Sequence, residues 1–390
     1  MGIIFNEDNK LFHIQSKRTS YILSVLETGH LINLYWGRKI NSNKINYVVK
    51  KRACGSFLAD LDNIEALHLE VIAQEYPSYG SPDLRSPAIQ VKLANGTTVT
   101  DFRYESHEIY RGKKKLEGLP ATYAEKEDEV ESLEITLKDE VANLRVILSY
   151  TVFENYDSIT RSCKVINDSN DEVDILRALS ANVDFTHSEF DLIQLSGSWA
   201  RERHIVRTAL RSGGQCIESR RGASSHAQNP FIALVSKDAT EDKGEVYGFN
   251  LIYSGNHYEA MDVCSFNKTR FVSGINPQSM SYGLLPGEKF EAPESVLTYS
   301  KKGYNGMSQN MHKFVREHIV RGKWKYKERP VLLNSWEANY FDITEEKLIN
   351  LAKAGKDIGI ELFVMDDGWF GKRNDDTSSL GDWYVNKDKL

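Results

Sequence analysis

Two adjacent carboxylates and a tryptophan follow a short apolar run near the end of the chain. The run covers residues 360–365 and leads directly into Asp366, Asp367, Gly368 and Trp369. Paired carboxylates accept hydrogen bonds from hydroxyl groups, and an indole offers an apolar face to a sugar ring. The same residue types also suit a solvated polar loop with a helix cap. They are therefore candidates for a site that binds a polyhydroxylated ligand.

A second apolar run, residues 329–336, ends similarly with Trp336. Between the two runs, Thr344 can cap a helix with an apolar face of Leu348, Leu351, Ala352 and Ile358, and Gly359 can end it. Short apolar runs are typical of parallel strands buried on both faces. Strand, helix and strand with short links predict a right-handed parallel unit, either a doubly wound sheet or a β/α barrel. The carboxyl ends of such strands are where these folds place their sites.

The first 300 residues are dominated by strand patterns. Apolar residues alternate with polar ones over residues 133–137 and 144–152, with a polar turn between them. This two-residue period predicts long strands with one buried face. Further strands are expected near 29–37, 173–179, 231–235, 246–253 and 271–275. Because hardly any stretch shows helical periodicity, we expect one large antiparallel sandwich or two fused ones.

The period changes near residue 305. Met307, Met311 and Phe314 fall at helical spacing, so an amphipathic helix is expected there. We therefore expect a β-sandwich domain over residues 1–305, a connecting helix over 306–328, and a β/α region over 329–390.

Composition excludes several classes of protein. The net charge of −6 and the dispersed Lys and Arg residues argue against a nucleic-acid partner. No apolar run approaches the roughly 18 residues that span a bilayer, so no membrane partner is expected. The first residues show neither the basic stretch nor the long apolar core of a signal peptide, so none is expected, and the four cysteines form no CxxC pair. Free thiols in a reducing cytoplasm are the expectation.

Three long blocks of sequence resemble bacterial family 36 α-galactosidases. The first runs from Gln74 to Gly80. The second begins with Gly197-Ser198-Trp199-Ala200-Arg201 and covers residues 197–203, 217–226 and 229–231. The third covers residues 334–342, 363–373 and 378–383. The blocks occur in the order of the family, and the resemblance covers essentially the whole chain.

The resemblance implies a β-supersandwich followed by a (β/α)8 TIM-type barrel, here truncated after about two strands. It implies a retaining hydrolase of terminal α-galactosides such as melibiose and raffinose, with no cofactor and no metal. Asp366 and Asp367 match aspartates that hold galactose hydroxyls, and Trp336 matches a wall of the pocket. Trp199 matches a sandwich tryptophan that in the family's homotetramers can reach a neighbouring subunit's site; a buried core position is its alternative.

The expected catalytic carboxyl groups are missing from the sequence. A retaining glycosidase uses two carboxyls, and the family's nucleophile lies in a Lys-Trp-Asp motif that this sequence lacks. Residues 330–390 are also far fewer than the roughly 250 of a complete barrel. We expect an N-terminal fragment that is inactive by itself, with no catalytic residue assigned and a complementing C-terminal chain as its partner.

Two other interpretations stay open at this point. The chain is alternatively a non-catalytic carbohydrate-binding or oligomerisation module left by truncation. A related retaining enzyme, such as an α-N-acetylgalactosaminidase or a galactosyl transferase, is a further alternative. The pocket residues that would separate these enzymes from an α-galactosidase are missing from the sequence.

Overall fold

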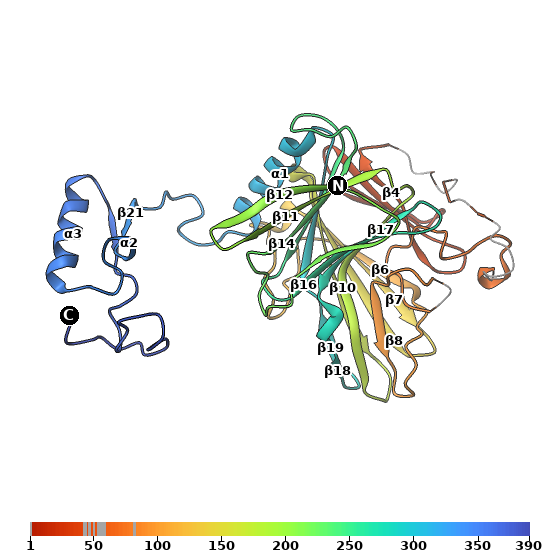
Figure 1. Cartoon of the computed structure of the whole chain (residues 1–390). Coiled ribbons are helices and arrows are strands. Elements are labelled where there is room, and N and C mark those ends of the chain that lie inside the picture. The colour runs from red at the N-terminus through yellow and green to blue at the C-terminus, as the bar shows by residue number, and fades with distance from the viewer. Residues whose placement is uncertain (1, 42–44, 46–47, 50, 53–59, 81–82) are drawn as a thin grey trace. The chain divides into compact units, whose positions relative to one another are not determined.

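The structure is a computed structural model that describes residues 2–41, 45, 48–49, 51–52, 60–80 and 83–390 (Figure 1). The chain divides into two compact units, Met1–Val320 and Arg321–Leu390. The expected domain limits near residues 305 and 329 stay a prediction. Among the described residues, no helix is long and apolar enough to cross a membrane.

The first unit consists mainly of three antiparallel sheets. The four-stranded sheet has the order β1 (Ile3–Asn6), β2 (Leu11–Gln15), β3 (Thr19–Val25), β4 (Leu31–Arg38). The six-stranded sheet has the order β13 (Gly213–Glu218), β16 (His257–Val263), β17 (Thr269–Ile275), β10 (Val173–Phe185), β18 (Tyr282–Leu284), with β5 (Ile89–Lys92) also paired to β10.

The ten-stranded sheet is the largest of the three. Its order is β12 (Arg201–Ala209), β11 (Phe190–Ser198), β14 (Gln228–Ser236), β15 (Val246–Ile252), β20 (Glu294–Ser300), β9 (Ser158–Asn167), β8 (Leu144–Phe153), β7 (Glu131–Asp139), β6 (Arg103–Arg111), with β19 (Lys289–Glu291) paired to β9. Short 3₁₀ turns lie at Leu61–Asn63, Glu127–Glu129, Glu154–Tyr156 and Pro277–Ser279.

The predicted alternating strands are confirmed. In the β7–β8 pair, Leu133 lies opposite Tyr150 and Ile135 opposite Leu148, and all four side chains are buried. The runs expected near 173, 231, 246 and 271 lie in β10, β14, β15 and β17. A two-residue period therefore locates the buried face correctly because successive side chains of a strand point to opposite sides.

One hydrophobic core takes side chains from all three sheets. It contains Tyr21 of β3, Leu148 of β8 and Phe271 of β17. Helix α1 (Gly303–His318) packs Met307, Met311 and Phe314 into a second cluster with residues of β14 and β15. The helix expected from the change of period is thus present, and it belongs to the first unit.

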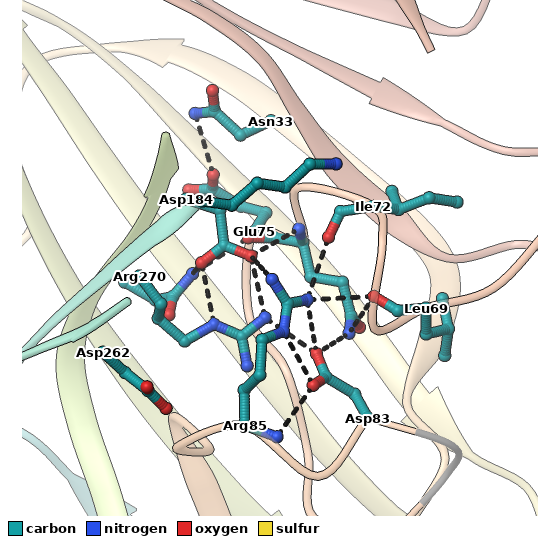
Figure 2. Close-up of polar contacts among 12 residues, drawn as sticks. Asn33, Leu69, Ile72, Glu75, Asp83, Arg85, Asp184, Asp262 and Arg270 are labelled. Atoms are coloured by element: carbon teal, nitrogen blue, oxygen red, sulfur yellow. Dashed lines mark hydrogen bonds and ion pairs between the residues drawn. The ribbon is translucent and has the colours of Figure 1, made fainter. Parts of the chain in front are cut away.

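A network of buried charges lies beside this core (Figure 2). Arg270 of β17 donates to Asp184 of β10 at 2.7 Å and to Asp83 at 2.8 Å, and Arg85 also reaches both carboxylates. Figure 2 shows the two guanidinium groups pointing toward the two carboxylates. Burial by itself would raise the pKa of Asp83, but Arg270 and Arg85 outweigh it and hold that pKa below its ordinary value.

A second buried network joins the first through consecutive residues of the chain. The backbone N–H of Gln74 donates to Asp184 at 3.1 Å. Its neighbour Glu75 pairs with Arg161 of β9 at 2.8 Å and accepts hydrogen bonds from the hydroxyls of Tyr21 and Tyr150. Burial raises the pKa of Glu75, although Arg161 and these hydroxyls oppose the shift. The segment 74–75 therefore connects strands of all three sheets.

The second unit contains the predicted parallel strand–helix–strand unit. Its elements are β21 (Leu332–Asn334), α2 (Trp336–Asn339), α3 (Glu345–Asp357) and β22 (Leu362–Val364). β21 and β22 pair in parallel, Thr344 Oγ1 accepts from Lys347 N at 3.3 Å, and Gly359 follows the helix with φ of +89°. The pairing, the cap and the helix end are confirmed.

The expected burial of these elements is partly wrong. Leu332 of β21 is 49% exposed and Leu362 of β22 is 41% exposed. Ile358, expected on the apolar face of the helix, is 81% exposed because it lies at the C-cap, beyond the last turn that packs on the strands. Within the second unit the sheet has only two strands, so part of their apolar surface is left uncovered.

No disulfide joins the cysteines that the structure describes, and the expected reducing cytoplasm stays a prediction. Cys163, Cys216 and Cys264 are free thiols, whereas Cys54 lies outside the described residues.

Replacement of Arg270 by methionine should destabilise the first unit strongly. The variant leaves Asp83 and Asp184 buried with one guanidinium fewer, and breaking such a buried pair costs about 3–5 kcal/mol. Urea unfolding measures the loss. The matched control Arg145→Met removes a partly exposed pair with Asp168 and should cost no more than about 1 kcal/mol. Equal losses in both variants would show that the buried network is not the stabilising feature.

Replacement of Asp83 by asparagine should give a pH-dependent loss of stability. The loss should be about 3 kcal/mol at neutral pH, as for other broken buried pairs. Because the pKa of Asp83 is lowered in the folded state, its contribution is complete above the unfolded pKa of about 3.9 and is lost as the pH falls through the folded value.

Urea unfolding of both chains between pH 7 and pH 3 tests this sign. The difference between wild type and variant should narrow below about pH 4. The exposed control Asp128→Asn should stay within about 0.5 kcal/mol of wild type throughout. A difference that widens on acidification would contradict the prediction.

Candidate functional site

Asp366 is held by the end of the neighbouring strand. It lies two residues after β22, and Asn334, the last residue of β21, donates from Nδ2 to Asp366 Oδ2 at 2.6 Å. The backbone N–H of Asp366 donates to Ser335 Oγ at 3.1 Å. The parallel register places Asn334 opposite Val364, so the ends of both strands meet at one edge. The sequence expectation of a polar strand edge is therefore realised in the fold.

Asp367 is oriented by an arginine in the loop that follows it. Arg373 Nε lies 3.0 Å from Asp367 Oδ1 and 3.1 Å from Oδ2. The Arg373 side chain is buried, and its Nη1 donates to the Ser378 carbonyl at 2.8 Å. The hydrogen bond to Asp367 raises the pKa of Arg373 further above its high ordinary value. Both carboxylate oxygens of Asp367 are thus held as hydrogen-bond acceptors.

Lys389 fastens the loops around the two aspartates. Its Nζ donates to the carbonyls of Phe341 at 2.8 Å, Gly368 at 3.1 Å and Arg373 at 3.4 Å. One ammonium group therefore joins the loop after β21 to the loop after β22.

Trp336 lies on the same strand edge. Its backbone N–H donates to Asn334 Oδ1 at 2.8 Å, so Asn334 contacts both the tryptophan and Asp366. The half-buried indole packs edge-on against Phe341, with ring centroids 4.9 Å apart. Phe341 also lies under the Arg373 guanidinium, at 5.4 Å from the ring centroid. The sequence-predicted residues Asp366, Asp367 and Trp336 are thus connected through three supporting side chains.

Trp199 lies in the first unit, at the tip of the β11–β12 hairpin. It is 83% exposed, so the alternative of a buried core position is wrong. The tip is fixed by local bonds: Arg201 Nε donates to Ser198 Oγ at 2.8 Å, and the Ala200 N–H donates to Glu202 Oε1 at 3.1 Å. The hairpin therefore presents an indole to solvent.

The supporting residues were not singled out from the sequence as part of the site. Asn334 and Ser335 stand at the end of the first apolar run, and Arg373 stands six positions after Asp367. Polar residues directly after an apolar strand were the signal available for Asn334 and Ser335. Arg373 carries no comparable local signal because its contact depends on how the loop folds back.

The arrangement suits recognition of hydroxyl groups. Two carboxylates held by Asn334 and Arg373 offer oxygen acceptors at a strand edge, with an indole nearby. Within the described part of the chain, no group of three or more His, Cys, Asp and Glu side chains is placed to hold a metal ion.

Comparison with known families gives two matches that together cover most of the chain. Residues 29–285 match the glycosyl hydrolase family 36 N-terminal domain, and residues 289–390 match melibiase.

Individual relatives agree with these matches. The chain is 48% identical to alpha-galactosidase AgaA of Geobacillus stearothermophilus, over all of this chain and 54% of that protein. It is 42% identical to the bifunctional alpha-galactosidase/sucrose kinase AgaSK of Mediterraneibacter gnavus, over all of this chain and 42% of that protein. The chain spans about half the length of the curated relatives it matches.

Solved structures show the same fold over nearly the whole chain. The crystal structure of the family 36 alpha-galactosidase AgaB from Geobacillus stearothermophilus superposes with a TM-score of 0.96 at 48% identity, covering 100% of this chain and 53% of that one. The alpha-galactosidase from Lactobacillus brevis gives a TM-score of 0.96 at 40% identity, covering 99% and 52%. Variants of AgaA have been solved with stachyose and with raffinose. With its three antiparallel sheets, its ordered blocks of sequence and these matches, the chain belongs to glycosyl hydrolase family 36.

Proposed function

We propose that this chain forms the sandwich and the galactose-binding beginning of the barrel of an α-galactosidase, a retaining hydrolase of terminal α-galactosides. The observation that carries the proposal is the pair Asp366 and Asp367, held at the carboxyl ends of two parallel strands by Asn334 and Arg373. Active sites of barrel enzymes lie at that end of the strands. The stachyose and raffinose complexes of the relative AgaA support a galactoside as ligand.

Asp366 and Asp367 bind the sugar in this proposal and do not break the glycosidic bond. A retaining enzyme needs two carboxyls about 5–5.5 Å apart on opposite sides of the bond, one nucleophile and one acid/base. Both carboxylate oxygens of Asp367 contact the Arg373 guanidinium. Asp366 lies at the end of the same strand as Asp367. We assign nucleophile and acid/base to carboxyls of further barrel strands, so this chain by itself would bind without turnover.

An assembly role of the β11–β12 hairpin belongs to the same proposal. β12 is the edge strand of the ten-stranded sheet and is exposed along almost its whole length. A tryptophan exposed at the tip of such a hairpin suits contact with a sugar or with another subunit. The exposed hairpin also suits the alternative of a binding or oligomerisation module without catalysis.

The substitution Asp366→Asn should lower α-galactosidase activity in a mixture that supplies the rest of the barrel. The assay uses p-nitrophenyl α-galactoside and the 390-residue chain, alone and mixed with a polypeptide that supplies the remaining barrel. Turnover should occur only in the mixture. Asp366→Asn should lower kcat/KM about 100-fold, because hydrogen bonds to charged groups are worth about 1.5–3 kcal/mol each.

The control is Asp388→Asn, an exposed carboxylate of the same unit whose loss should change kcat/KM by less than about twofold. Turnover by the 390-residue chain alone would place the catalytic carboxyls within it and contradict the assignment. No turnover in any mixture would favour the non-catalytic module.

The substitution Arg373→Gln should weaken substrate binding because it removes the partner that orients Asp367. Arg373 is a positioning residue, because it contacts the carboxylate rather than the proposed sugar. KM should rise severalfold more than kcat falls, Arg373→Lys should recover part of the loss, and the exposed neighbour Lys372→Gln should behave as wild type. An equal loss in the lysine and glutamine variants, with KM unchanged, would indicate a purely structural role.

A further inference from the structure

A concavity in the first unit is lined by an unusual density of positive charge. Its volume is about 290 Å³, and five of its ten lining residues are cationic while none is acidic. The five are Arg18, Arg38, Lys39, Lys301 and Lys302, here called the cation cluster. The net charge of the whole chain is −6, so this local excess is opposite in sign to the protein.

Three parts of the fold bring the cation cluster together. Antiparallel pairing of β3 with β4 sets Thr19 opposite Arg38, and the Lys39 N–H donates to the Arg18 carbonyl at 2.7 Å. Lys301 and Lys302 lie in the link from β20 to α1. Arg18 spans to the helix, where its Nη2 donates to Asn310 Oδ1 at 3.2 Å.

The protein neutralises little of this charge. Arg18 pairs with the buried Asp157. The Lys39 ammonium donates to a carbonyl, that of Ser16 at 2.9 Å, which leaves its charge uncompensated. Over the described ranges, Arg38, Lys301 and Lys302 have no carboxylate within ion-pair distance.

A further carboxylate, that of Glu245, contacts Tyr299, which lines the concavity. Glu245 accepts from the Tyr299 hydroxyl at 2.5 Å. Even if Asp157 and Glu245 each offset one charge, three of the five remain. Like charges gathered in a concavity repel one another unless an anion separates them.

The N-terminal N–H groups of α1 are not free to bind an anion in the concavity. The first N–H groups of α1 already donate to backbone carbonyls: Gly303 to Gly244 at 3.2 Å, Tyr304 to Thr240 at 3.0 Å and Asn305 to Glu241 at 2.9 Å. Recognition would therefore come from side chains. Arginine supplies a planar fork for two oxygens and lysine a mobile point charge, and both match phosphate oxygens.

We propose that the cation cluster binds phosphate, either free or as the ester of a small metabolite. The volume is roughly ten times the ~30 Å³ share of one water molecule, which leaves room for an organic part beside the phosphate. The buried Ser300 and the half-buried Asn310 provide polar groups on the wall for that part. This site uses residues of the first unit only and does not rest on the proposed galactosidase function.

Calorimetric titration of the 390-residue chain at low ionic strength tests the proposal. The probes are inorganic phosphate and glucose 6-phosphate, with glucose as the uncharged control. Both phosphates should bind, glucose should not, and added sodium chloride should weaken binding. Tighter binding of glucose 6-phosphate would identify an ester as the ligand, whereas equal binding would identify phosphate itself.

The double variant Arg38→Gln/Lys301→Gln should weaken phosphate binding about tenfold or more, since it removes two charge-assisted partners. The matched control Lys10→Gln/Lys126→Gln changes the net charge equally at two exposed positions outside the concavity and should bind as wild type. All four side chains replaced are exposed, so circular dichroism should be unchanged. Absence of binding by wild type at millimolar phosphate, or equal weakening in both double variants, would overturn the proposal.

Discussion

Glu75 and its neighbour Gln74 lie where the three sheets meet, and the charges around them are shared between sheets. Arg161 reaches Glu75 from the ten-stranded sheet, and Arg270 of the six-stranded sheet reaches Asp184, which also accepts from the Gln74 backbone. A buried charge without its partner costs far more than a completed pair. These buried charges therefore link the three sheets, which also share the hydrophobic core that contains Tyr21, Leu148 and Phe271.

The candidate site is held by a few local contacts within the second unit. Asn334, Arg373 and Lys389 each hold one part of the loops around Asp366 and Asp367, and all of them lie in the second unit. The sandwich has a different kind of surface, with a tryptophan at a hairpin tip and a basic concavity beside α1. Family membership explains the order of the first and second units along the chain. The chemistry of the aspartate site, of the hairpin tip and of the basic concavity depends on the local contacts at each place.

Much of the fold follows from local patterns in the sequence. Alternation over residues 144–152 locates a strand and its buried face, because side chains of a strand point alternately to opposite sides. Thr344 caps a helix since its hydroxyl needs only the N–H three residues ahead. The parallel pairing of β21 with β22 follows from the helix between them. The resemblance of long blocks identifies the family because it, too, depends only on residues close to one another in the sequence.

Only the tertiary structure decided which residues distant in the sequence contact one another and which side chains are buried. The block that begins at Gln74 resembles the family by sequence, yet its Glu75 is fully buried among partners up to 86 positions away. Trp199 could be assigned to a core or to a surface until its hairpin was placed. The sequence by itself determined the strands, the helix cap and the family, and it marked Asp366 and Asp367 as candidate site residues. The charge networks, the support of Asp367 and the gathering of cations beside α1 required the fold, because such contacts join residues whose spacing along the chain carries no periodic signal.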